Sequence, residues 1–302
     1  MSDVGFDGRV AIITGAGGGL GREHALLLAS RGAAVVVNDL GGNADGTGAG
    51  QSAADLVVKE IADAGGQAVA NYDSVTTPEG GEAIVKAALD AFGQVDIVIN
   101  NAGILRDKSF VKLTPEDMKA VLSVHLEGAF FVSQPAFRFM KERGGYGRFV
   151  FTASAAGIFG NFGQSNYGAA KMGLVGLSNV LAQEGAKYNI LSNVIAPIAQ
   201  TRLLGDLLGP LADKLNPSQV SGLVAYLCSD DSTVTHEIFS VGGGRVARIF
   251  VGLTPGWFGG QGSVPTPEEI RDHLDEIRDT NGFIIPGNAA EELAAAVPLL
   301  TS

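Results

Sequence analysis

The chain has 302 residues, 46% of them hydrophobic, which suffices for one large α/β domain or two small ones. Its 32 acidic and 21 basic residues give a formal charge of -11, which repels nucleic-acid phosphates and argues against a DNA or RNA partner. The single cysteine, Cys228, lies in an apolar run. It therefore forms no internal disulfide, and we expect it to be buried.

The termini and the longest apolar runs bear on location. The N-terminus is short and polar, and no stretch of 18 apolar residues occurs, so the sequence predicts neither a signal peptide nor a membrane span. The final residues Leu300, Thr301 and Ser302 differ from the Ser-Lys-Leu type of peroxisomal address. We expect a soluble, cytoplasmic protein.

Apolar runs of strand length alternate with amphipathic helical stretches along the chain. The expected strands are residues 10–14, 33–38, 67–71, 95–100, 148–152 and 190–195. The expected helices are residues 22–31, 53–64, 115–140 and 167–187. Continuous apolar strands separated by helices predict an α/β fold with a parallel sheet that is covered by helices on both faces. Residues 41–50, with five glycines, read as an inserted loop.

A glycine-rich segment, residues 15–21, joins the first strand to the following helix. Glycines let the backbone approach a dinucleotide pyrophosphate, and the helix N-terminus favours the anion; an ordinary strand-to-helix turn is the alternative. Asp39 ends the second strand, where a carboxylate can accept hydrogen bonds from ribose hydroxyls and repel a 2'-phosphate. Neither Gly18 nor Leu40 is basic, and Arg22 is read as a surface contact. The pattern favours NAD over NADP on a Rossmann-like, doubly wound sheet.

Two further strand ends extend the same crevice. Asp73 follows the third strand and is placed to hold the adenine edge, although capping of the next turn is an alternative. Residues 100–103, Asn-Asn-Ala-Gly, end the fourth strand. Both lie at the carboxyl edge of the predicted sheet, where such folds bind ligands.

Three side chains could carry acid–base chemistry. Ser154 follows the fifth strand, and Tyr167 and Lys171 are four positions apart, on one helix face. A cation beside a phenol should lower the pKa of Tyr167 toward the range of a general acid or base. Ser154 could hold the substrate oxygen, and Lys171 could also bond the nicotinamide ribose. A pair on the helix surface is the alternative for Tyr167 and Lys171.

The glycine loop, the Asn-Asn-Ala-Gly segment and Ser154/Tyr167/Lys171 together resemble the short-chain dehydrogenase/reductase family over residues 8–245. Residues 38–42, 70–74, 100–106, 160–164 and 241–244 further resemble the (3R)-hydroxyacyl-CoA dehydrogenase module of the peroxisomal multifunctional type 2 (17β-hydroxysteroid dehydrogenase type 4) enzymes. The resemblance implies NAD-dependent oxidation of a (3R)-3-hydroxyacyl-CoA, or of a 17β-hydroxysteroid, by a homodimer or homotetramer. An NADPH-dependent 3-oxoacyl-carrier-protein reductase and a non-catalytic nucleotide sensor are the alternatives.

The resemblance also implies a set of cofactor-binding residues and no metal site. These residues are Gly15, Gly19, Leu20, Gly21, Asp39, Asp73, Ser74, Asn101, Ala102, Gly103, Tyr167, Lys171, Pro197 and Thr201. His125 stands where many members have an asparagine that helps a proton-relay water, and a structural histidine is the alternative. Ile198 replaces the usual glycine after Pro197.

The substrate end is less clearly marked. The leucine-bearing residues 201–216 are expected to form a lid for an apolar substrate, or else to be packing leucines. Phe159, Phe162 and Gln164 would border the reacting carbon. Candidates to hold CoA phosphates are Arg106, Lys108, Arg202 and Lys214.

The chain is expected to divide late. Residues 1–244 would form the dinucleotide-binding catalytic domain, and residues 245–302 an extension packed on it. In that extension Thr266 begins a helix that places Ile270, Leu274 and Ile277 on one face.

Overall fold

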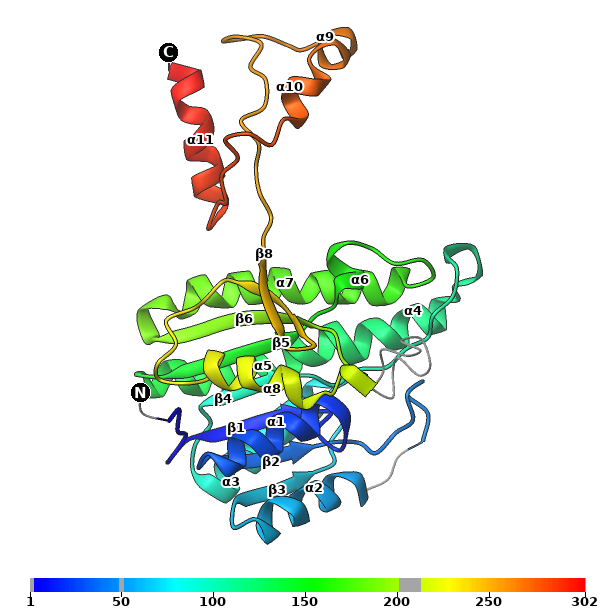
Figure 1. The fold of residues 1–302 in the computed structure, drawn as a ribbon, viewed down its shortest axis with the longest axis vertical. Helices are drawn as coiled ribbons and strands as arrows, with labels where there is room; N and C mark the ends of the chain where they lie inside the picture. Colours follow the sequence, from blue (N-terminus) through cyan, green and yellow to red (C-terminus); the bar gives the residue numbers. More distant parts are fainter. Residues whose placement is uncertain (1–2, 49–51, 201–212, 302) are drawn as a thin grey trace. The chain divides into compact units, whose positions relative to one another are not determined.

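A mostly parallel sheet organises the larger part of the chain. The computed structural model describes residues 3–48, 52–200 and 213–301. Within these residues the sheet has eight strands in the order β3-β2-β1-β4-β5-β6-β7-β8 (Figure 1). The strands are β1 (Val10–Thr14), β2 (Ala34–Asn38), β3 (Gln67–Asn71), β4 (Ile97–Asn100), β5 (Gly147–Thr152), β6 (Ile190–Pro197), β7 (Ile238–Gly242) and β8 (Arg245–Ile249). The six predicted strands are confirmed.

The strand order reverses direction between β1 and β4. β1 pairs in parallel with both β2 and β4, so the chain runs outward from β1 to β3 and then crosses back to β4. In open sheets of this type, ligands bind outside the carboxyl ends of the strands at this reversal. The end of β1 and the end of β4 are therefore the expected position of a site.

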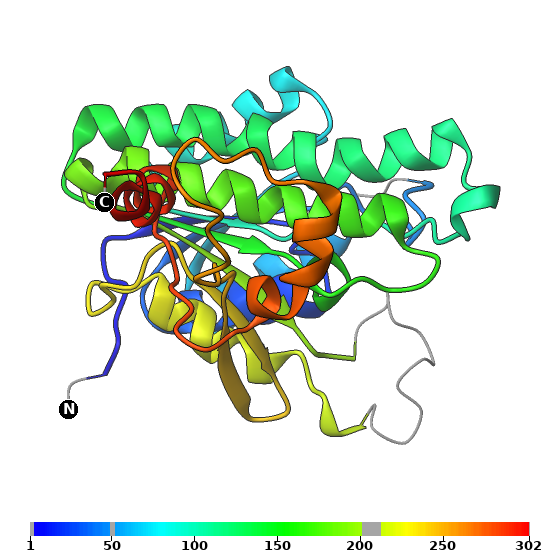
Figure 2. The same cartoon turned by 90° about the horizontal axis from the view of Figure 1, so that it is seen from above.

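Helices cover both faces of the sheet. In the described residues these are α1 (Gly19–Ser30), α2 (Ser52–Asp63), α3 (Pro78–Phe92), α4 (Pro115–Leu122), α5 (Gly128–Arg143), α6 (Ala155–Ile158), α7 (Ser165–Gly185) and α8 (Ser218–Leu227), with short turns η1 (Phe110–Lys112), η2 (Ser123–Glu127) and η3 (Ala186–Tyr188). α1 packs against α2 and α8, whereas α5 packs against α3 and α7 (Figure 2). The central strands are buried from both sides, which is why they read as continuous apolar runs.

The long helix predicted for residues 115–140 is interrupted. η2, a π-helical turn, separates α4 from α5 and contains the buried His125. A π turn takes in one extra residue and is common at functional sites. Gly128 follows it, where a Cβ would lie 2.8 Å from Cγ2 of Val75. Apolar periodicity alone does not reveal such a turn, because the helical pattern continues on both sides of it.

The described chain divides into two compact units, Met1–Arg248 and Ile249–Ser302. Most of β8 therefore lies with the sheet, although the sequence suggested that the extension begins at residue 245. The second unit contains α9 (Pro267–Asp272), α10 (Leu274–Arg278) and α11 (Ala289–Thr301). Thr266 and Glu269 form a capping box at the start of α9, as predicted: the side chain of each accepts a hydrogen bond from the backbone N–H of the other. The expected single helix, however, breaks at His273. Ile270 and Leu274 remain exposed.

The structure also bears on the predictions about Cys228 and about membrane-spanning helices. Cys228 is fully buried, and burial raises the pKa of its thiol to about 12. Across the described ranges, none of the helices has both the length and the apolar character needed to cross a bilayer.

Candidate active site

The glycine loop between β1 and α1 is shaped for a close ligand. Gly15 has φ +65°, and a Cβ on it would lie 2.8 Å from Cα of Ala102. A Cβ on Gly21 would lie 2.4 Å from the carbonyl oxygen of Gly15. No side chain caps the N-terminus of α1, and its first turn contains no acidic residue. The first-turn amides of α1 therefore have no side-chain acceptor, and the loop fits a diphosphate.

The ends of β1 and β4 are locked together by Thr14 and Asn101. The hydroxyl of Thr14 accepts hydrogen bonds from the backbone N–H groups of Asn101 and Ala102, at 3.0 and 3.1 Å. The Asn101 amide donates to the carbonyls of Thr14 and Gly15, at 3.0 and 3.1 Å. The sequence interpretation gave no role to Thr14, because this role depends on which loop lies opposite the end of β1.

Asp39 lies beside the glycine loop. Its two carboxylate oxygens accept hydrogen bonds from the backbone N–H groups of Gly17, at 2.8 Å, and Gly41, at 2.7 Å. The carboxylate thus holds the glycine loop, and its predicted role toward a ribose stays a prediction. A Cβ on Gly17 would collide with this carboxylate, so the loop and Asp39 constrain each other.

Asp73 belongs to a polar network at the ends of β2 and β3. Its carboxylate accepts a hydrogen bond from the amide of Asn71 at 2.7 Å, and its carbonyl accepts one from Asn38 at 2.9 Å. Ser74, the next residue, pairs its hydroxyl with that of Thr76 at 2.9 Å. These bonds order the loop after β3, and they leave both predicted roles of Asp73 open.

Ser154, Tyr167 and Lys171 come together. Ser154 caps α6 by accepting a hydrogen bond from the N–H of Ala156 at 3.2 Å, and its hydroxyl is close enough to the phenol of Tyr167 to favour a lower pKa of that phenol. The ammonium nitrogen of Lys171 lies 5.4 Å from the centre of the Tyr167 ring and donates to the carbonyl of Thr152. The helix spacing of four therefore does place both side chains on one face of α7, with Lys171 buried and Tyr167 partly exposed.

The pKa of Tyr167 is raised, not lowered as the sequence suggested. Burial is the largest cause and outweighs the opposing hydrogen bond from Ser154. Burial also lowers the pKa of Lys171 to about 7. The sequence-based expectation considered the neighbouring cation and left out desolvation, which disfavours the charged form of both groups.

His125 lies next to this group. Its ring meets the Tyr167 ring edge-on, with centroids 5.1 Å apart and an angle of 89° between the planes. Its Nε2 is 3.0 Å from the backbone nitrogen and 2.8 Å from the carbonyl oxygen of Ile104. Burial, followed by the charge of Lys171, places the pKa of His125 well below its usual value.

Two loops meet at the other side of Tyr167. The amide of Gln164 donates to Asp107 at 2.7 Å, and the backbone N–H of Lys108 donates to Gly163 at 2.8 Å. Arg106 and Lys108 both pair with Asp117, at 3.5 and 3.6 Å.

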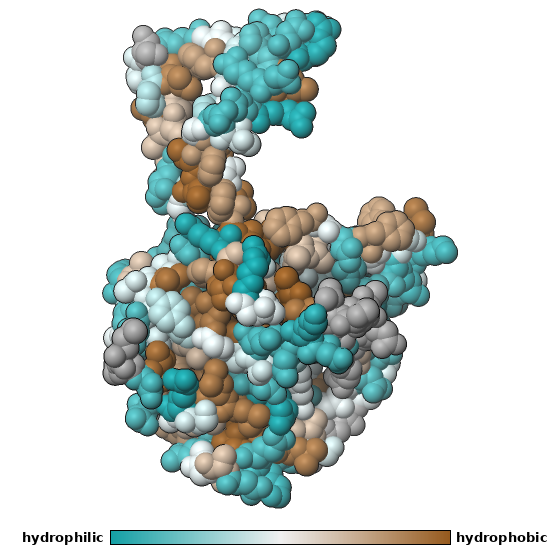
Figure 3. All heavy atoms as spheres, in the orientation of Figure 1, coloured by the Kyte–Doolittle hydropathy of each residue, from teal (hydrophilic) through white to brown (hydrophobic). Residues whose placement is uncertain are grey.

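Apolar side chains gather on these loops. Figure 3 shows them over the region of η1 and the loop between α6 and α7. The strongly exposed members are Phe110, Val111, Phe159 and Phe162. This rim could contact an apolar substrate.

For some predicted site residues the structure gives only their position in a helix or strand or their exposure, and others lie outside the described residues. Gly19 and Leu20 begin α1, and Pro197 ends β6. Lys214 is exposed. Thr201, Arg202 and most of the predicted lid, residues 201–212, lie outside the described residues.

The profile of the short chain dehydrogenase family matches residues 9–206. The chain belongs to the short-chain dehydrogenase/reductase family. It is 52% identical to a putative short-chain type dehydrogenase/reductase of Mycobacterium tuberculosis, over 94% of this chain and 98% of that protein. It is 36% identical to a hydroxyacyl-CoA dehydrogenase of the same organism, over 81% of this chain and 80% of that protein.

A solved structure supports the same family assignment. The peroxisomal multifunctional enzyme type 2 of Drosophila melanogaster is similar with a TM-score of 0.82 and 39% identity. The match covers 98% of this chain and 50% of that enzyme, so the dehydrogenase spans about half the length of this relative.

Membership in the family makes this chain an oxidoreductase with a Rossmann-like site for a nicotinamide cofactor. The glycine loop, the uncapped α1 and the adjacent Asp39 are the features that fit such a cofactor.

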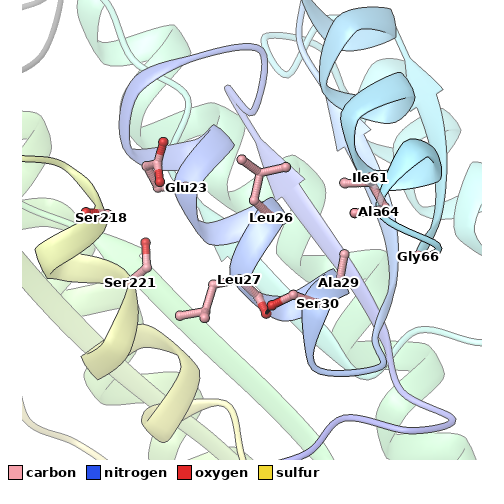
Figure 4. A pocket seen from close by; sticks show the side chains of 10 residues that line it. All are labelled: Glu23, Leu26, Leu27, Ala29, Ser30, Ile61, Ala64, Gly66, Ser218 and Ser221. Carbon is pink, nitrogen blue, oxygen red and sulfur yellow. Dashed lines mark hydrogen bonds between the residues drawn. The ribbon is translucent and has the colours of Figure 1, made fainter.

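The described residues also contain a hollow of about 370 Å³ around α1, next to α2 and α8 (Figure 4). Its lining includes Leu26, Leu27, Ile61 and Ser221, and none of the candidate site residues. Its position is therefore separate from the proposed chemistry.

Proposed function

We propose that this dehydrogenase oxidises a (3R)-3-hydroxyacyl-CoA to the 3-oxoacyl-CoA with NAD. The observation that carries the proposal is the cluster in which Ser154 and the buried Lys171 lie beside the phenol of Tyr167. A phenol held in this way can exchange a proton with the oxygen of a secondary alcohol or ketone.

In this mechanism the cofactor supplies the hydride acceptor, and the protein handles the proton. Ser154 donates a hydrogen bond to the substrate oxygen and holds it next to the Tyr167 hydroxyl. During oxidation Tyr167 accepts the hydroxyl proton, so it must first lose its own. Because burial raises the pKa of Tyr167, we expect the oxidation rate to rise with pH in the alkaline range.

The preference for NAD follows from Asp39. A carboxylate held by Gly17 and Gly41 at the end of β2 would lie near the 2'-position of a bound adenosine and repel a phosphate there. An NADPH-dependent 3-oxoacyl-carrier-protein reductase, the alternative enzyme, would need a cation at this place. Titration with both cofactors separates the two functions.

The thioester substrate is supported by the matches to a hydroxyacyl-CoA dehydrogenase and a multifunctional enzyme type 2. Arg106 and Lys108 could offer positive charge to CoA phosphates at the rim, although both pair with Asp117. A 17β-hydroxysteroid would fit the apolar rim but needs no such cations. Substitution of Arg106 by Gln should raise KM for the thioester and leave KM for a steroid unchanged if the CoA interpretation is correct.

The decisive test is NAD reduction at 340 nm with (3R)-3-hydroxyacyl-CoA thioesters and a 17β-hydroxysteroid. Tyr167→Phe should retain NAD binding and lose at least about 1,000-fold in kcat, because the phenol hydroxyl carries the proton. If no alcohol is oxidised although NAD binds tightly, the result would instead favour a nucleotide sensor.

We also propose a homodimer or homotetramer. Apolar side chains on α4, α5 and α7 are partly uncovered in the single chain. The more exposed ones are Met118, Phe130, Met172 and Val180. A two-fold axis could pair such faces. Sedimentation that shows only monomer at micromolar concentration would contradict this.

A further inference from the structure

His125 is held in a position that its neighbours strictly define. It lies in the π turn η2 with only 3% of its surface exposed. Its Nε2 is within hydrogen-bond distance of both the N–H and the C=O of Ile104, and one ring nitrogen can serve only one of them at a time. In the described residues, Nδ1 has no hydrogen-bond partner. The ring is thus anchored through Nε2.

The loop after β4 is built around this ring. A Cβ on Gly103 would lie 2.3 Å from Cε1 of His125, which only a shift of the ring or the loop could relieve. The ring also meets the Tyr167 ring in a T-shaped contact, with centroids 5.1 Å apart. The imidazole therefore contacts both the Asn101–Ile104 loop, which lies at the predicted cofactor crevice, and the proposed acid–base residue Tyr167.

We propose that His125 is a positioning residue for hydride transfer. Its Nε2 anchors the Asn101–Ile104 loop, its ring packs against Tyr167 and fixes the position of the phenol relative to that loop, and it carries no proton itself. The proposal rests on the dehydrogenase function. The charge environment agrees with it, because burial and the charge of Lys171 both keep the imidazole neutral, with a pKa well below the usual value. Tyr167 and Lys171 remain the groups that titrate beside it.

Side-chain shape gives a direct test. A glutamine amide reaches about as far as Nε2 of histidine, and an asparagine amide only about as far as Nδ1. Either atom of the glutamine amide could replace Nε2 at Ile104. His125→Gln should therefore preserve the anchoring, whereas His125→Asn and His125→Ala should lose it.

The experiment compares kcat, KM for NAD and the pH profile of these variants with the parent. We expect His125→Asn and His125→Ala to lose about 10-fold to 100-fold in kcat/KM for NAD, the size typical of a small misplacement near the reacting groups. His125→Gln should stay within about 5-fold, with the pH limbs of the parent. His24→Gln is the matched control, since His24 is also fully buried but contacts Ser221 on α8.

Three outcomes would overturn the proposal. Activity kept by Asn and lost by Gln would mean that His125 acts through Nδ1. Loss in both variants together with a displaced pH limb would mean that the imidazole carries a proton. Full activity in Asn, Gln and Ala alike would mean that His125 has no part in the reaction.

A second comparison tests the packing between Gly103 and His125 directly. Gly103→Ala should lower kcat/KM by about 10-fold or more in the parent, and by much less in the His125→Ala background, where space for the methyl is open. Equal losses in the two backgrounds would contradict the packing on which the proposal rests.

For each variant, thermal melting measures whether the protein still folds, and calorimetric titration measures its affinity for NAD. If the parent binds NAD but turns over no alcohol, the proposed function fails. NAD affinity then still reports whether Gln, unlike Asn, preserves the loop.

Discussion

Replacement of Lys171 by Met should stabilise the protein while it abolishes turnover. Lys171 has 3% of its surface exposed, and burial lowers its pKa to about 7. A lysine that the fold desolvates in this way reduces stability at neutral pH, and the reaction is the reason to retain it. Met has a similar length and needs no proton.

The magnitude follows from the pKa. A fall from 10.5 to about 7 corresponds to a penalty of about 5 kcal/mol when both folded and unfolded states are protonated. The variant also loses the hydrogen bond from Lys171 to the carbonyl of Thr152, which costs about 1–3 kcal/mol. The net gain in the free energy of unfolding should be about 2–4 kcal/mol, or roughly 5–10 °C in Tm.

The gain should depend on pH in a defined direction. Below pH 7 both states of the parent hold the proton, so the penalty is complete. Between pH 7 and 10.5 the unfolded state holds more protons, the parent becomes more stable as pH rises, and the advantage of Lys171→Met declines. Differential scanning calorimetry at pH 6 and pH 9.5 measures this, with the exposed Lys59→Met as the control.

A Lys171→Met variant that melts below the parent at pH 6 would refute the reasoning. An equal shift in Tm at both pH values would also do so, because it would show that packing, and not desolvation of the ammonium, sets the difference.

Three other predictions concern separate parts of the molecule. Asp39→Ala removes the acceptor for Gly17 and Gly41, so KM for NAD should rise roughly 10-fold to 100-fold. The ratio of kcat/KM for NAD to kcat/KM for NADP should fall. If steady-state kinetics show this ratio unchanged, Asp39 does not select the cofactor. Burial lowers the pKa of His24 to about 3, so the stability that its neutral form provides is complete above pH 6.5 and declines as pH falls toward 3; His24→Gln should flatten that part of a urea-monitored stability profile. Burial raises the pKa of Cys228 to about 12, so the native protein should react with a thiol reagent at least about 100-fold more slowly than the urea-unfolded chain, and equal rates would contradict the burial.

The sheet could be predicted because its central strands are buried on both faces. Such strands must be apolar throughout, so β1, which is buried along its whole length, was predicted with its observed bounds. β8 was not predicted as a strand. It lies at the sheet edge and presents Arg245 and Arg248, and charged edge strands carry no apolar run.

The sequence by itself determined the order of the chemistry. The glycine loop follows β1, and Ser154, Tyr167 and Lys171 have fixed separations along one strand–helix segment, so their association depends mainly on local spacing. Local geometry of this kind is encoded within a few residues, and it also led to the family.

Only the tertiary structure decided how those groups are tuned. The contact of Thr14 with Asn101, that of Asp39 with Gly17, and that of the His125 ring with Gly103 all join segments that are distant in sequence. The raised pKa of Tyr167 has the same origin, because desolvation depends on everything packed around the phenol and not on its neighbour in the motif.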